Sequence, residues 1–72
     1  MNIVGAEPSD LIKALSLKYQ AEIAQAEANI QVYIHHPVGI GEHPDLVAAI
    51  DSQVELIAHA EDKLKVLGDR YL

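Results

Sequence analysis

Residues 35–45 read His35-His36-Pro37-Val38-Gly39-Ile40-Gly41-Glu42-His43-Pro44-Asp45. This stretch holds two of the three prolines, two of the four glycines and three of the four histidines of the chain. Pro37 cannot continue a helical hydrogen-bond ladder, and glycine permits backbone angles that other residues avoid. Pro44 suits the first position of a new helix, with His43 at the cap position and Asp45 in the first turn. The sequence therefore predicts a turn over residues 36–43 that folds one helix back against another.

A helix is predicted before this turn, over about residues 10–35. Ser9 can cap free backbone N–H groups, and Asp10 suits the positive end of the helix dipole. At 1.5 Å per residue the helix would be about 37 Å long. Residues 1–8 show no periodicity, so we expect a frayed or disordered N-terminus followed by a hairpin over 9–72. One apolar stripe follows steps of three and four residues, as on a helix packed against a partner: Ile12, Leu15, Tyr19, Ile23, Ala26, Ile30 and Tyr33.

A second apolar stripe falls on the opposite side of the same predicted helix. Most of its members are small: Ala14, Leu17, Ala21, Ala24, Ala28 and Val32. A helix that is apolar on two sides is usually covered on two sides, and one hairpin partner covers only one. The alternative is that alanine serves here as a good helix former at exposed positions. Leu17 and Val32 favour a second interface, because these two larger apolar residues lie in the same stripe.

The second helix is predicted from Pro44 to at least Leu67, and to Tyr71 if Gly68 does not end it. Its outer side carries Asp51, Glu55, His59, Asp62, Lys63 and Arg70. Ala49 and Leu56 widen the inner stripe on one flank. The inner stripe itself is apolar throughout: Leu46, Ile50, Val54, Ile57, Ala60, Leu64 and Leu67.

Folding the chain about Ile40 predicts the register of the hairpin, because facing residues should then have numbers that sum to about 80. The pairs Ile30–Ile50, Ala26–Val54, Ile23–Ile57, Leu15–Leu64 and Ile12–Leu67 are all apolar. The exception pairs Tyr19 with Glu61, where the phenol would donate to the carboxylate at the edge of the core.

The composition excludes several classes of function. The 72 residues carry a net charge of −6 and no cysteine, so neither a cationic nucleic-acid surface nor a disulfide is expected. No apolar run is long enough to span a membrane, and residues 1–6 lack the features of a signal peptide. We therefore expect a soluble, cytoplasmic protein. A chain this short is marginally stable alone, which leaves oligomerisation as the expected source of further stability.

The histidines of the turn are weak candidates for a metal site. His35, His36 and His43 lie near Glu42 and Asp45, and imidazole and carboxylate are suitable zinc ligands. None of the usual ligand spacings is present, however, and histidines that bond free backbone groups at helix ends are the simpler interpretation. A phosphate-binding loop is disfavoured, since no Lys follows the glycines. Paired carboxylates have no predicted pocket, so we expect no catalytic residue, no enzyme activity and no cofactor.

An acidic face on the second helix is the remaining candidate binding surface. Asp51, Glu55 and Asp62 lie along its outer side, and small acidic inhibitors or adaptors bind basic partners through such faces. The simpler interpretation is that these carboxylates keep the protein in solution.

The stretch from Pro37 to Asp45, followed by a helix with Ala60-Glu61-Asp62-Lys63-Leu64, resembles a family of short proteins from tailed bacteriophages, marine cyanophages especially. The resemblance covers about residues 10–67, and the turn is its most specific part. It implies a phage-encoded protein in the cytoplasm of an infected bacterium, or a minor part of the virion. It implies no activity and no catalytic residue.

Together these patterns predict an all-α protein, an antiparallel two-helix hairpin that assembles as a four-helix bundle dimer. The leading functional prediction is a non-catalytic structural or protein-interaction module that acts as a homo-oligomer. The alternatives are an acidic inhibitor or adaptor that binds a host protein, and a metal-binding turn. We expect the subunit interface to comprise Ala14, Leu17, Ala21, Ala24, Ala28, Val32, Ala49 and Leu56.

Overall fold

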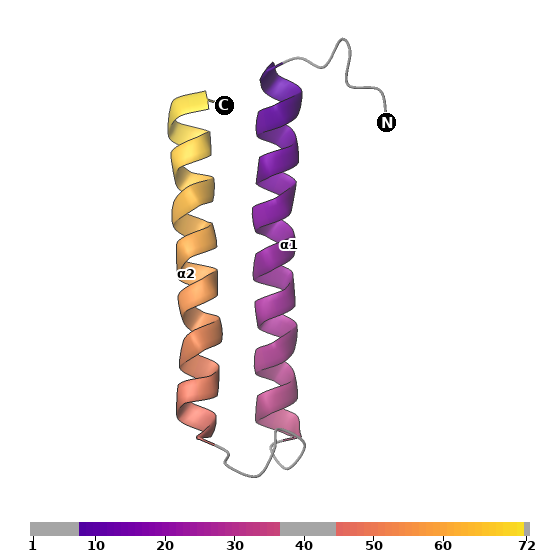
Figure 1. The fold of residues 1–72 in the computed structure, drawn as a ribbon, viewed down its shortest axis with the longest axis vertical. Helices are drawn as coiled ribbons and strands as arrows, with labels where there is room; N and C mark the ends of the chain where they lie inside the picture. The colour runs from indigo at the N-terminus through magenta and orange to yellow at the C-terminus, as the bar shows by residue number, and fades with distance from the viewer. Residues whose placement is uncertain (1–7, 37–44, 72) are drawn as a thin grey trace.

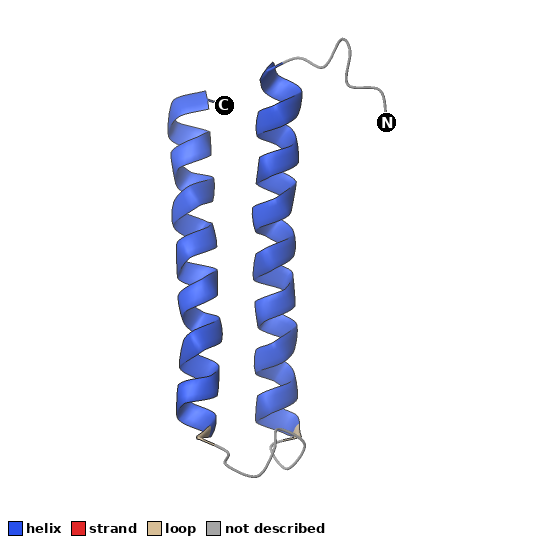
Figure 2. Cartoon of the chain, in the orientation of Figure 1, coloured by secondary structure: helices blue, strands red, loops and turns tan. Residues whose placement is uncertain are grey.

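A computed structural model describes residues 8–36 and 45–71, and these residues form two helices (Figure 1). Helix α1 spans Pro8–His35 and helix α2 spans Leu46–Tyr71. The helices lie side by side and antiparallel, so α1 begins at the end of the molecule where α2 ends (Figure 1). The described chain contains no strand, as Figure 2 shows. The prediction of an all-α antiparallel hairpin is therefore confirmed.

Helix α1 contains 28 residues, which makes it about 42 Å long. It begins two residues before the expected position, so Ser9 lies inside the first turn instead of capping it. Proline is tolerated in a first turn because its missing N–H would have no intrahelical partner there. At the other end, the N–H of His36 donates to the carbonyl of Val32 at 2.8 Å, which closes the last turn.

Helix α2 is capped by Asp45 rather than by His43, which corrects the expected start of this helix. The N–H of Ala48 donates to the Asp45 carboxylate at 2.9 Å, the contact that a capping aspartate makes with the third helical residue. The helix therefore begins at Leu46, and it continues through Gly68 to Tyr71. The expected turn over residues 36–43 lies outside the described residues except for His36, and residues 1–7 lie outside them as well.

The contact between the helices is narrow. Ala26, Ala60 and Leu67 are the buried apolar residues, and no large side chain in the described ranges is fully buried. The other members of the two predicted inner stripes are half-buried, with one exception. Val54 is 48% exposed, because the neighbouring Gln53 occupies the position that faces α1. Placing Val54 in the inner stripe was therefore wrong by one residue, or about 100° around the helix.

Two side-chain contacts between the helices establish the register. The Asn29 amide donates to the Gln53 amide oxygen at 3.1 Å, and the Lys63 ammonium lies 5.3 Å from the centre of the Tyr19 ring. Both pairs of residue numbers sum to 82, so the hairpin is centred one residue later than predicted. Tyr19 accordingly meets Lys63 and not the exposed Glu61, in a cation–π contact instead of a hydrogen bond.

Candidate functional site

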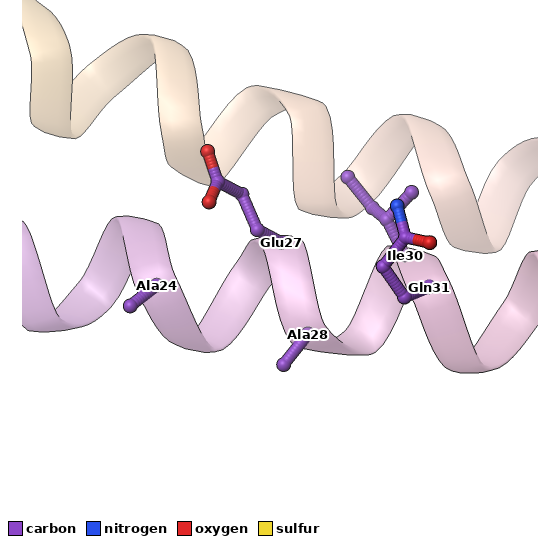
Figure 3. Close-up of a pocket in the computed structure, with 5 residues that line it drawn as sticks. All are labelled: Ala24, Glu27, Ala28, Ile30 and Gln31. Carbon is purple, nitrogen blue, oxygen red and sulfur yellow. The ribbon is translucent and has the colours of Figure 1, made fainter.

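The outward side of α1 carries the six residues that were predicted as a second apolar stripe, and we call this surface the alanine face. At 100° per residue, these residues centre on the side of α1 opposite the buried Ala26. In Figure 3, Ala24 and Ala28 point away from α2, whereas Ile30 points toward it. All six members are exposed in the single hairpin: Ala14, Leu17, Ala21, Ala24, Ala28 and Val32.

The two large members of the alanine face are open to solvent. Leu17 is 54% exposed and Val32 is 49% exposed. Successive members of the alanine face are three or four residues apart, and no charged residue lies between them on that side of the helix. The apolar side chains are also spread more evenly around α1 than around α2, as expected for a helix with two partners.

A shallow hollow of about 440 Å³ lies beside the alanine face (Figure 3). Every residue that lines it belongs to α1, so it is a groove along one helix and not an enclosed site: Ala24, Glu27, Ala28, Ile30 and Gln31. Small side chains leave this space because nothing extends beyond the β-carbon. A second helix could approach the backbone closely here, as small residues permit in packed helix pairs.

The structure does not bring Ala49 and Leu56 onto the alanine face. Both belong to the part of α2 that borders α1; Ala49 is half-buried, and Leu56 is exposed. Leu56 lines a separate hollow between the helices together with Gln25 and Gln53. The predicted subunit interface therefore divides into two parts, the alanine face on α1 and an apolar edge at the seam of the hairpin.

The outward side of α2 is acidic. Asp51, Glu55 and Asp62 are exposed there and follow one another at spacings of four and seven residues, which places them in one line along the helix. Asp69 continues the line and forms an ion pair with Lys65, in which the Lys65 Nζ atom lies 2.9 Å from the Asp69 Oδ2 atom. We call these four residues the acidic column, and it runs along the side of α2 that faces away from α1.

The histidines at the end of α1 show no metal-binding arrangement. His35 and His36 are both exposed, and the Nε2 atom of His35 lies 3.2 Å from the Gln31 amide oxygen. No group of three or more potential metal ligands gathers anywhere in residues 8–36 and 45–71. His43 and Glu42 lie outside the described residues, and Asp45, the remaining member of the predicted cluster, caps α2.

Sequence reasoning missed the polar pair that joins the helices. Asn29 and Gln53 are half-buried, and both fall within the inward three-four spacing of their helices. The signal was present, because Asn29 and Gln53 each lie three residues after one member of an inner stripe and four residues before another. Such a pair specifies which sides of two helices face each other, as a single buried asparagine does in a coiled coil. It therefore also determines which side of α1 faces outward.

Neither described helix contains a stretch long enough and apolar enough to cross a bilayer. Comparison of the chain with protein-family models, curated proteins and solved structures finds no match. Function is therefore inferred from the surfaces of this chain alone.

Proposed function

We propose that the protein is a non-catalytic structural or protein-interaction module that works as a homodimer. Two hairpins associate through their alanine faces to form a four-helix assembly. Because the alanine face lies across α1 from α2, the two α1 helices would occupy the centre and the two α2 helices the outside. The acidic columns would then remain in water on both sides of the dimer.

The size of the core supports this proposal. A single hairpin buries two alanines and one leucine in the described residues, which is little apolar surface to offset the entropy of ordering two long helices. A second copy would supply the missing apolar contact.

The observation that carries the proposal is the exposure of Leu17 and Val32 on a stripe otherwise made of alanines. Scattered exposed apolar residues are normal on a protein surface. A line of apolar residues along most of a helix, directly opposite the hairpin contact, is instead typical of an interaction surface. The small residues between Leu17 and Val32 also allow two helices to approach closely.

Sedimentation equilibrium over a wide range of protein concentration tests the proposal. We expect the molar mass to approach twice the 7.8 kDa of one chain, and helicity measured by circular dichroism to fall on dilution. A monomer that keeps full helicity at every concentration would contradict the proposal, because such a hairpin would not need a second copy.

The acidic column favours a second candidate function, in which the protein is an inhibitor or adaptor that binds a basic host protein. Capture of partners from a bacterial lysate, compared between the natural protein and a triple variant, tests this candidate. The variant D51N/E55Q/D62N removes three carboxylates from an exposed line while keeping side-chain shape. If both proteins recover the same partners in the same amounts, the acidic column is not a binding surface.

The resemblance to tailed-phage proteins motivates a proposal about location, namely the cytoplasm of an infected bacterium or the virion. An antibody against the hairpin would distinguish the two in an infected culture, because purified virions and the cleared lysate can be probed separately. Absence from both fractions throughout infection would contradict the proposed phage origin.

A further inference from the structure

We infer that the second copy lies antiparallel to the first along the alanine face, so that the two turns point to opposite ends of the dimer. This inference rests on the proposed dimer and adds the orientation of its subunits. Two features of the hairpin carry it, namely the distribution of charge along the molecule and the order of large and small residues along the alanine face.

Charge is divided unequally between the two ends of the hairpin. All five Lys and Arg residues of the chain lie at the end where α1 begins and α2 ends, within residues 8–20 and 61–71. The same segments hold four acids, so this terminal end has a net charge of +1. Residues 21–36 and 45–60 form the turn end, which holds five acids and no Lys or Arg, for a net charge of −5 with histidine neutral.

This asymmetry disfavours a parallel dimer. Parallel packing would place two turn ends of net charge −5 at the same end of the dimer, with Glu22 and Glu27 of the two central α1 helices nearest to each other. Those two helices would lie about 8–10 Å apart, which is comparable with the Debye length of about 8 Å at physiological ionic strength. Antiparallel packing instead places each turn end beside a terminal end of net charge +1. Like-charge contact between subunits is thereby exchanged for weak attraction at both ends.

The order of side chains along the alanine face favours the same orientation. A two-fold axis midway between Ala21 and Ala24 would place Leu17 of each copy level with Ala28 of the other, and Ala21 level with Ala24. Leu17, the largest member of the alanine face, then meets a small residue, and Val32 falls level with Lys13, one residue from Ala14. Parallel packing would instead oppose Leu17 to its own copy and leave a gap between paired alanines, and such voids are costly.

The position of this axis is consistent with a dimer that uses the whole of α1. A midpoint between Ala21 and Ala24 lies within about two residues of the centre of Pro8–His35. The two α1 helices would therefore overlap along almost their full length, which gives the greatest contact area that two helices of this length can make.

Spin labels at single cysteines test the orientation, and the chain has no natural cysteine to interfere. The exposed positions Leu11, Gln20 and His36 lie on the flanks of α1 and outside the alanine face. Each would be replaced by cysteine, labelled, and measured by double electron–electron resonance in the dimer. The rise of 1.5 Å per residue converts sequence position into distance along the axis.

An antiparallel dimer predicts a distinct set of distances. Measured along the axis, the two labels at position 36 should lie about 40 Å apart and the two at position 11 about 35 Å apart. The two labels at position 20 should be separated along the axis by less than about 10 Å. A mixed dimer with one label at position 36 and one at position 11 should show a short distance. A parallel dimer reverses this result, because all three matched pairs become short and the mixed pair separates by about 38 Å.

Sedimentation of the same labelled samples separates the two possible failures. Dimers with short distances at positions 11 and 36 would overturn the antiparallel orientation and leave the proposed function standing. Samples that remain monomeric, together with a monomeric natural protein, would overturn both.

Discussion

The two helices differ most on the sides that they turn away from each other. The outward side of α1 presents the alanine face, with Leu17 and Val32 open to solvent, whereas the outward side of α2 presents the acidic column. Carboxylates are stable in water, but an apolar line of this length is stabilised when it is covered. The comparison shows that one hairpin carries two kinds of outer surface, one suited to association and the other to solvent.

The largest expected effect is loss of the dimer when a charge enters the alanine face. We predict that Ala24→Glu raises the dissociation constant of the dimer by a factor of about 1,000 or more, which corresponds to about 4 kcal/mol. The physical reason is that each subunit would bury an unpaired carboxylate in the interface. Sedimentation equilibrium of the variant measures this change.

Ala58→Glu is the matched control for this substitution. Ala58 is an exposed alanine in the middle of α2, on the side that faces away from α1, so the same chemical change occurs on the acidic side of the hairpin. We expect the dimer to be unaffected. Equal weakening by both substitutions would mean that the difference between the two outer faces has no role in assembly.

A smaller effect is expected when the alanine face loses apolar volume. We predict that Leu17→Ala destabilises the assembled protein by about 2–3 kcal/mol, the cost of truncating a leucine that is buried in the dimer. Thermal unfolding at several protein concentrations measures the loss, which should lower the midpoint most at low concentration. Leu11→Ala serves as the control, because Leu11 is exposed on the flank of α1. A loss of similar size in both variants would argue that Leu17 faces water in the assembled protein as well.

Most of the fold could be predicted from the sequence because helices have a fixed period. Apolar residues that recur every three or four positions identified both helices and nearly all of their inward positions. Val54 was the exception: an apolar residue was preferred over Gln53, although the geometry of α2 turns Gln53 toward α1. Hydrophobicity and helical position disagreed at this site, and helical position determined the result.

The details at the ends of the helices were less predictable, since they depend on local hydrogen bonds. Pro44 suggested a helix start with His43 as the cap, yet the carboxylate of Asp45 provides the cap one residue before Leu46. The register differed from the expected one for a related reason, because it depends on how many residues the turn uses. The alanine face was recognisable from periodicity alone, but periodicity shows only that a face is apolar and not what covers it.

Substitutions in the polar pair Asn29 and Gln53 test whether this pair keeps the alanine face and the acidic column on the outer sides of the hairpin. We predict that Gln53→Leu costs about 1 kcal/mol, because the Asn29 amide loses its partner in a half-buried position. The double variant N29L/Q53L should recover that stability, since two leucines of similar volume need no hydrogen bond. Urea denaturation of both singles and the double gives the coupling between the two residues.

The double variant should nevertheless form a weaker dimer than the natural protein. Without the polar pair, nothing requires the same sides of α1 and α2 to face each other, and the alanine face would no longer be held outward in every molecule. A double variant that dimerises as tightly as the natural protein would contradict the assigned role of the pair in orientation.

The smallest expected effect lies on the acidic column, and its sign is opposite to that of the others. Asp51 and Glu55 are four residues apart on an exposed helical surface, a spacing at which like charges repel. We predict that Glu55→Gln stabilises the protein by about 0.2–0.5 kcal/mol at low ionic strength and leaves the dimer intact. Chemical denaturation in low and high salt measures this gain, which should vanish when salt screens the repulsion. A gain in stability that persists in high salt would show that Glu55 does more than repel Asp51. Loss of the dimer would show that α2 also takes part in assembly.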